Sequence, residues 1–134
     1  MITIYCALYA EAQYLIQYFE LKKDAKVTHF QMFSNEKNDI RVVSTGVGKI
    51  NMVVAIAELS ALYPPKAEDI IVNYGSCAVK NCAVGSIFMC NKIVEELTAR
   101  TFYPDMLYQH PFAEACLHTV EKEKLENLAD DCIY

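Results

Sequence analysis

Apolar residues along this chain fall into runs of two kinds, and each kind predicts a different secondary structure. Short, nearly uninterrupted apolar runs predict strands at residues 2–8, 27–33, 40–45, 70–74, 86–94 (with 97–102 extending or returning it) and 115–120. Longer apolar or amphipathic segments predict helices at residues 9–19, 49–63 and 121–130. The resulting order, β-α-β-β-α-β-β-β-α, favours an α/β fold with layers around a mixed sheet.

Polar segments separate these elements. Residues 22–24 predict a turn, and residues 34–39 predict the turn of a hairpin between two strands. The chain stops at residues 131–134, which resemble the start of a further strand.

The stretch at residues 70–78 organises the predicted sheet. Its short apolar run is typical of a strand buried on both faces in the middle of a parallel sheet. Gly75 and Ser76 follow, so we expect a turn at the carboxyl end of this strand that carries the Ser76 hydroxyl. Ligands of open α/β sheets bind at that edge, and we therefore expect the site there.

The helix at residues 49–63 is apolar nearly all round, which predicts that other parts of the protein cover it. Gly46 and Gly48 precede it in the sequence Gly-Val-Gly-Lys, which is too short for the common phosphate-binding loops. A tight turn from strand to helix explains these glycines, although such a junction also presents N–H groups to an anion or a sugar hydroxyl.

Glu11 lies in the first turn of the helix predicted at residues 9–19, just beyond the first strand. Negative charge is favourable near a helix N-terminus, so a purely structural role explains it. Its place at a strand end also suits a functional carboxylate. The residues alone leave both interpretations open.

Composition limits the class of protein. The 134 residues predict one domain over residues 1–134. A hydrophobic content of 54% and a mean hydropathy of +0.12 predict either a sheet buried on both faces or a surface that binds more protein. No run approaches the roughly 18 apolar residues of a membrane span, and no signal peptide is recognised, so we expect a cytoplasmic protein that binds no membrane. A net charge of −5 argues against nucleic acid as a partner.

The six cysteines form no Cys-x-x-Cys pair. Without a secretion signal, we expect them to be reduced and buried. Ligand pairs at zinc spacing are missing, so a redox or metal protein is the weakest of the functional readings. We expect no metal and no cofactor.

Three motifs, in the same order and at familiar spacing, resemble a known family. They are Ile-Tyr-Cys-Ala-Leu-Tyr-Ala-Glu at residues 4–11, Ser-Thr-Gly-Val-Gly-Lys at 44–49 and Val-Asn-Tyr-Gly-Ser-Cys-Ala at 72–78. Together they resemble the nucleoside phosphorylase superfamily of the purine and uridine type. The chain looks most similar to its hydrolytic branch, the methylthioadenosine/S-adenosylhomocysteine nucleosidases, over residues 2–90.

The resemblance implies a three-layer α/β/α sandwich around a mixed central sheet and a purine nucleoside as the substrate. Glu11 matches the carboxylate that activates the attacking water. Gly75 and Ser76 match the turn beside the ribose, and Gly46 and Gly48 match the glycine turn at the neighbouring strand end. The implied role is purine nucleoside metabolism and methionine salvage.

Asn73 separates the two branches of the family. The phosphorylases commonly carry an arginine at this position to bind phosphate, and asparagine has no charge to replace it. Water is therefore the expected nucleophile, and Glu11 with a raised pKa would serve as the general base. A phosphate-dependent phosphorylase and a non-catalytic nucleoside-binding or assembly module on the same scaffold stay open as alternatives.

The chain also departs from the family pattern. Gly85-Ser86 stands where Gly-Asp is common, and residues 101–105 replace a characteristic His-x-Asp, so the particular nucleoside is left open. The family's Met-Glu ribose clamp and its base-protonating aspartate lie beyond a strand that resembles residues 131–134. We therefore expect a fold that lacks its C-terminal part, completed by a second chain or inactive alone. Family members also imply a homodimer or a higher homo-oligomer.

Overall fold

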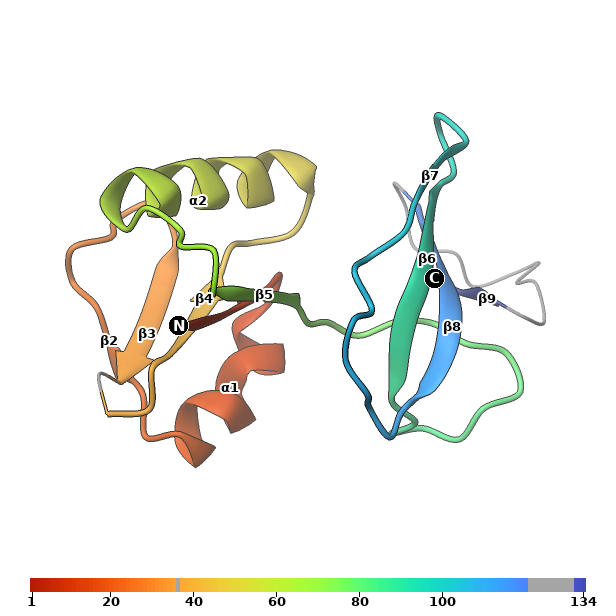
Figure 1. The fold of residues 1–134 in the computed structure, drawn as a ribbon, viewed down its shortest axis with the longest axis horizontal. Coiled ribbons are helices and arrows are strands. Elements are labelled where there is room, and N and C mark those ends of the chain that lie inside the picture. The colour runs from red at the N-terminus through yellow and green to blue at the C-terminus, as the bar shows by residue number, and fades with distance from the viewer. Residues whose placement is uncertain (36, 121–131) are drawn as a thin grey trace. The chain divides into compact units, whose positions relative to one another are not determined.

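The structure, a computed structural model, describes residues 1–35, 37–120 and 132–134 of the chain (Figure 1). Two compact units make up the chain, Met1–Ser76 and Cys77–Tyr134. That residues 1–134 act as one domain stays a prediction. No helix within the described ranges combines the length and the apolar character that crossing a bilayer requires.

The first unit is built on a five-stranded mixed sheet. Its strands lie in the order β2-β3-β4-β1-β5 and have the bounds Lys22–Lys23 (β2), Gln31–Asn35 (β3), Ile40–Ser44 (β4), Ile2–Cys6 (β1) and Ile70–Asn73 (β5). β1 pairs in parallel with β4 on one side and β5 on the other, with Ile2 opposite Ile40 and Ile70. β2, β3 and β4 pair antiparallel, which confirms the hairpin predicted on either side of residues 34–39.

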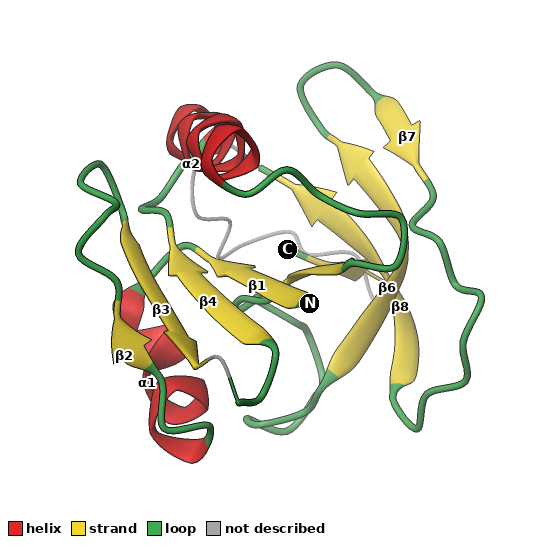
Figure 2. Ribbon diagram, turned by 60° about the vertical axis from the view of Figure 1, so that its left-hand side comes forward, coloured by secondary structure: helices red, strands yellow, loops and turns green. Residues whose placement is uncertain are grey.

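Two helices cover the two faces of this sheet. α1 (Tyr9–Tyr18) packs on one face, where Ala12 and Ile16 join a buried cluster with Val42. α2 (Lys49–Leu62) packs on the other, where Ala55 and Leu59 join a cluster with Val43. Val42 and Val43, which are adjacent in β4, thus belong to the cores on opposite faces of the sheet, because successive side chains of a strand point to opposite faces. Figure 2 shows the sheet between the two helices, and the predicted three-layer α/β/α arrangement is confirmed in this unit.

β5 differs from the prediction of a buried central strand. It is the edge strand of the first unit's sheet, and Ile70 and Ile71 are 55% and 65% exposed. A short apolar run looks the same in sequence whether its strand has one neighbour or two. Among the described residues β5 pairs with β1 alone, so its second edge and much of both faces stay open.

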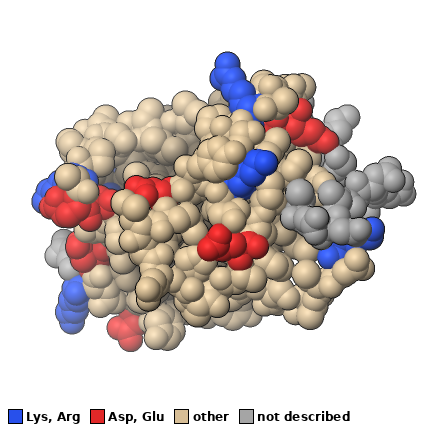
Figure 3. Space-filling model, turned by 45° about the vertical axis from the view of Figure 1, so that its right-hand side comes forward, with Lys and Arg blue, Asp and Glu red and all other residues tan. Residues whose placement is uncertain are grey.

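α2 is also less covered than its sequence predicts. Only Ala55 and Leu59 are fully buried, whereas Ile50 is 80% exposed and Val53 64%. A single sheet contacts one face of a helix, so the apolar residues on the other face remain in solvent. The apolar surplus of the chain therefore forms exposed surface, and uncharged side chains cover most of the face drawn in Figure 3.

Smaller differences concern the segment before β4. Residues 22–24 were expected to turn, but Lys22 and Lys23 form β2 at the sheet edge, opposite Ser34 and Phe33. The strand expected at residues 27–33 begins later, because β3 spans Gln31–Asn35. Val27 and Phe30 lie before it and still belong to the α2-side core, which accounts for their apolar character.

The second unit contains a four-stranded sheet in the order β7-β6-β8-β9. The strands are Phe88–Glu95 (β6), Arg100–Phe102 (β7), Ala113–Thr119 (β8) and Cys132–Ile133 (β9). β6 and β8 pair in parallel, and β7 returns antiparallel to β6, which agrees with the predicted strands. The helix expected at residues 121–130 lies outside the described residues.

The cysteines are free where the structure describes them, but they are not uniformly buried. Cys6 is buried, Cys90 and Cys116 are half-buried, and Cys77 and Cys82 are exposed. The expectation of buried thiols is therefore right for Cys6 and wrong for Cys77 and Cys82, which lie in and after the turn that leaves β5.

Candidate active site

The carboxyl ends of three strands meet at one edge of the first unit's sheet. β4, β1 and β5 are parallel neighbours, and backbone hydrogen bonds connect the segments that follow them. The Gly46 N–H donates to Ala7 O at 3.0 Å, and the Tyr74 N–H donates to Tyr5 O at 2.8 Å. Thr45, which is buried, donates from Oγ1 to Cys6 O at 3.3 Å. The three motifs singled out in the sequence therefore converge at this edge.

Glu11 and Ser76 are joined by direct hydrogen bonds, although 65 positions separate them in the chain. Glu11 Oε1 accepts hydrogen bonds from the Ser76 N–H at 2.9 Å and from Ser76 Oγ at 2.7 Å. Its other oxygen, Oε2, accepts from the Leu8 N–H at 2.9 Å. The carboxylate thus caps α1 and also binds the turn at Ser76, which confirms the structural interpretation of Glu11. Its functional role stays a prediction.

These hydrogen bonds set the protonation state of Glu11. Partial burial acts to raise the pKa of the carboxyl. The backbone N–H groups of Ser76 and Leu8, the Ser76 hydroxyl and the Ala7 N–H together outweigh it and hold the pKa below its ordinary value of 4.5. The expectation of a raised pKa is therefore wrong, because these donors stabilise the charged form. Glu11 is ionised at neutral pH.

Each glycine of the site has its own role. Gly46 has φ of +88°, which favours glycine, and a Cβ there would lie 3.1 Å from Asn51 Nδ2, so the Asn51 side chain would have to shift. Gly48 has φ of +101° at the N-cap of α2, where no side chain caps the helix. A Cβ on Gly75 would lie 3.5 Å from Glu11 Oε1, so glycine leaves that side of the carboxylate open.

Asn73 ends β5 opposite Tyr5 and is exposed at the same edge. It brings no charge to the site. Cys6 lies below the edge, where burial and then the Glu11 charge raise the pKa of its thiol to about 11, and its Sγ donates to Val43 O at 3.4 Å. The thiol is therefore protonated and is no nucleophile. No group of three His, Cys, Asp or Glu side chains suited to a metal occurs within the described ranges.

Sequence reasoning missed the backbone donors at Ala7 and Leu8. Both residues have apolar side chains, and their contribution comes from N–H groups that the end of β1 and the start of α1 orient toward Glu11. The available signal was the position of Glu11 three residues after Leu8, which is the spacing at which a side chain reaches back to an N-cap N–H.

The geometry supports proton transfer to and from a bound molecule. Glu11 offers an ionised carboxylate with one open side beside Gly75, and Ser76 offers a hydroxyl next to it. Oε1 already accepts two hydrogen bonds, which fill its roughly two lone-pair sites, so it can take a proton from a ligand only if one of these donors releases it. The Ser76 hydroxyl can rotate away, whereas the backbone donors are fixed.

Replacing Ser76 with alanine tests this electrostatic account. Ser76→Ala removes the hydroxyl donor and keeps the N–H, so we expect the pKa of Glu11 to rise toward 4.5. Because the folded-state pKa is depressed, the ionised carboxylate stabilises the site above the ordinary pKa, and this stabilisation is lost as the pH falls through the lowered value. Carbon-13 NMR of the Glu11 carboxyl, recorded against pH, measures this pKa in the wild type and in Ser76→Ala. The stabilisation follows from how far each pKa lies below the ordinary value.

Ser86→Ala is the matched control, because the Ser86 hydroxyl donates to Ala83 O in the second unit. It should leave the pKa of Glu11 unchanged. An identical Glu11 titration in wild type and Ser76→Ala would contradict the assignment of the hydroxyl as a donor.

Comparison with known proteins extends the resemblance seen in the motifs. No protein-family model matches the sequence, and no curated protein matches it significantly. Solved structures do match. The apo 5'-methylthioadenosine nucleosidase of Arabidopsis thaliana superposes with a TM-score of 0.71 at 20% identity, over 90% of this chain and 62% of that chain.

Two further structures give the same result. The Neisseria meningitidis 5'-methylthioadenosine/S-adenosylhomocysteine nucleosidase, in complex with methylthio-immucillin-A, has a TM-score of 0.69 at 15% identity, over 88% of this chain and 63% of its own. The Colwellia psychrerythraea enzyme in complex with adenine has a TM-score of 0.67 at 19% identity, over 90% and 62%. The chain thus spans less than two thirds of the length of these nucleosidases. Over that part, it has the nucleoside phosphorylase-type fold that they share.

Proposed function

We propose that this chain binds a purine nucleoside at the carboxyl edge of β1, β4 and β5 and takes part in cleaving its N-glycosidic bond with water. The observation that carries the proposal is the direct bond between the ionised Glu11 carboxylate and Ser76 at the edge where Gly46 and Gly48 also lie. The fold adds support, because the matching solved structures are nucleosidases.

In the proposed reaction the bond between ribose C1′ and the purine nitrogen breaks, and a bond from C1′ to the water oxygen forms. Positive charge develops on the ribose as the base departs. Glu11 takes the proton that the water loses and opposes that positive charge. Ser76 holds the carboxylate in place and offers its hydroxyl to the sugar. The departing purine takes up a proton from a general acid, which we assign to a polypeptide segment outside this chain.

Asn73 favours water over phosphate as the nucleophile. A phosphate dianion beside the ionised Glu11 needs a cation to offset their repulsion, and the end of β5 offers an uncharged amide instead. A phosphate-dependent phosphorylase therefore fits the edge less well. The non-catalytic alternative, a nucleoside-binding module on this scaffold, fits the same geometry without the chemical step.

Release of free purine tests the proposal. The 134-residue chain is incubated with methylthioadenosine, adenosylhomocysteine, adenosine and inosine, each with and without phosphate. We expect slow release, limited by the absence of that general acid, and we expect phosphate not to increase it. Glu11→Gln should lower kcat by about 10²–10⁴-fold, the usual contribution of a general base.

Glu20→Gln is the matched control, since Glu20 is an exposed glutamate just after α1. It should leave turnover unchanged. Release that requires phosphate would contradict hydrolysis, and unchanged turnover in Glu11→Gln would contradict the role of Glu11. No release from the folded chain would favour the binding module.

We also propose that a second copy of the chain covers α2, in the cytoplasm. Five exposed residues of α2 lie at i, i+3, i+4, i+7 and i+11 spacing and form one apolar face away from the sheet: Ile50, Val53, Val54, Ala57 and Ala61. This spacing is the one with which helices pack against each other, and no charged residue interrupts it. The open edge of β5 supports the further proposal that another polypeptide completes the sheet.

Analytical ultracentrifugation tests self-association. We expect a dimer or larger species for the wild type and dissociation in Val53→Glu, because a charge would then lie in the apolar contact. Gln13→Glu places the same charge at an exposed position of α1 and should leave the distribution of oligomeric species unchanged. A wild-type monomer at high concentration would contradict the proposal.

A further inference from the structure

Arg41 is a buried cation for which the described residues supply no counter-ion. It occupies the second position of β4, at the end of the strand opposite to the candidate active site, and is only 9% exposed. Its Nε is completely buried and donates to no described residue. Within the described part of the chain, no carboxylate forms an ion pair with it. Burial of an arginine normally requires such a partner, because the charge and the N–H groups lose their water.

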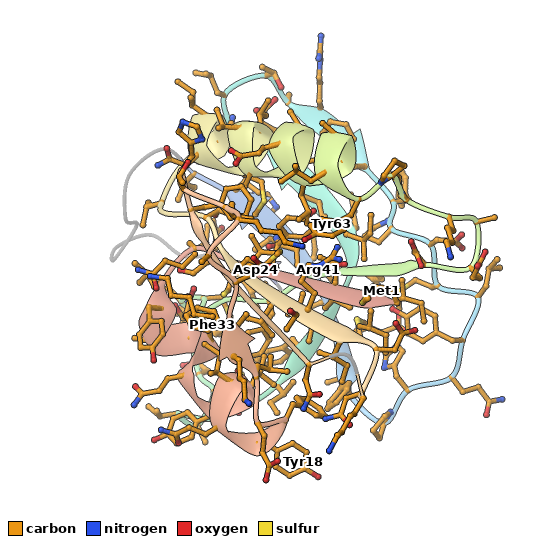
Figure 4. The ribbon with its side chains drawn as sticks, turned by 90° about the vertical axis from the view of Figure 1, so that its left-hand side faces the viewer. Met1, Tyr18, Asp24, Phe33, Arg41 and Tyr63 are labelled. Carbon is orange, nitrogen blue, oxygen red and sulfur yellow. The ribbon has the colours of Figure 1, made fainter. Side chains whose placement is uncertain are left out.

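One aromatic ring holds the guanidinium in place. Arg41 Cζ lies 4.2 Å from the centre of the Tyr63 ring, which is a stacking contact between cation and ring. Tyr63 is fixed in turn, since its hydroxyl donates to Asp24 Oδ2 at 3.3 Å. Figure 4 labels Arg41 below Tyr63, between Asp24 and Met1. The ring orients the plane of the guanidinium but accepts none of its N–H groups in the manner of a carboxylate.

Arg41 lines a hollow of about 450 Å³. The end of α2 and the segment after it form an apolar wall at Leu62, Tyr63 and Pro64, and Lys66 adds a second cation. Two of the three acidic residues that line the hollow are engaged by the Met1 ammonium, which lines it as well. Asp39 and Asp69 both contact the Met1 ammonium, at 2.8 and 3.2 Å, and Asp69 also accepts from the Lys66 N–H at 2.8 Å.

From this geometry we propose that the hollow beside Arg41 binds a small carboxylate with an apolar body. A carboxylate offers two oxygens in a plane, which matches the parallel N–H groups of a guanidinium. The apolar wall accommodates the rest of such a molecule. Asp39, Glu68 and Asp69 line the same hollow, so a dianion such as phosphate is repelled more than a carboxylate is. This site lies at the opposite sheet edge from Glu11 and does not depend on the nucleosidase proposal.

NMR titration of the 134-residue chain with sodium benzoate tests the proposal, at constant ionic strength and neutral pH. Benzamide is the matched neutral probe, and inorganic phosphate is the dianionic one. We expect benzoate to shift the Arg41 Nε–H and Tyr63 ring signals in a saturable manner. Benzamide should give no saturable shift, and phosphate should bind more weakly than benzoate.

Variants locate the binding. Arg41→Met removes the cation and should weaken benzoate by about ten- to a hundredfold, the usual loss for hydrogen bonds to a charged group. Lys66→Gln changes an exposed side chain, leaves the core intact and should weaken benzoate by a smaller factor. Tyr63→Phe keeps the ring and should retain binding, as should Glu11→Gln at the other edge.

Three results would overturn the proposal. They are equal, non-saturable shifts with benzoate and benzamide, phosphate binding tighter than benzoate, and benzoate affinity unchanged in both Arg41→Met and Lys66→Gln. If Arg41→Met does not fold, as judged by circular dichroism, Lys66→Gln alone decides the location.

Discussion

The parallel pairing of β1 with both β4 and β5 is the constraint on which the candidate site depends. Three parallel strands must end at one edge, and this places the segments that follow them side by side. The hydrogen bond between Glu11 and Ser76 is a direct consequence, because α1 begins at Tyr9, shortly after β1 ends at Cys6, and the Gly-Ser turn follows shortly after β5. The strand pairing therefore brings together in space two residues that are 65 positions apart in the chain.

Glu11 shows how one side chain serves stability and chemistry together. Its Oε2 caps the start of α1, and its Oε1 holds the turn at Ser76. The donors that fix the carboxylate also lower its pKa, which keeps it ionised but makes it a weaker base. Displacement of the Ser76 hydroxyl by a bound sugar would remove one of these donors and strengthen the base where it is needed.

Much of this arrangement could be predicted from the sequence, because it rests on local patterns. Helical spacing located α1, and the hairpin composition located the hairpin of β3 and β4, although not the start of β3. Strand-end positions brought Glu11, Gly46 and Ser76 together. The prediction was wrong where it depended on neighbours. The apolar run of β5 does not reveal that the strand is an edge, and the composition of α2 does not reveal that one face stays exposed. The lowered pKa of Glu11 was likewise invisible, because backbone N–H groups at Ala7, Leu8 and Ser76 produce much of it.

We propose that the carboxyl edge of β1, β4 and β5 is a nucleoside site, whether or not the chain completes the reaction alone. Amide chemical shifts of the unmodified chain, recorded during titration with methylthioadenosine, test it most directly. We expect saturable shifts at Gly46, Gly48, Gly75 and Ser76 and no shifts around Arg41, at the amino ends of these strands. Saturation without shifts at these four amides, or no saturable binding at all, would contradict it.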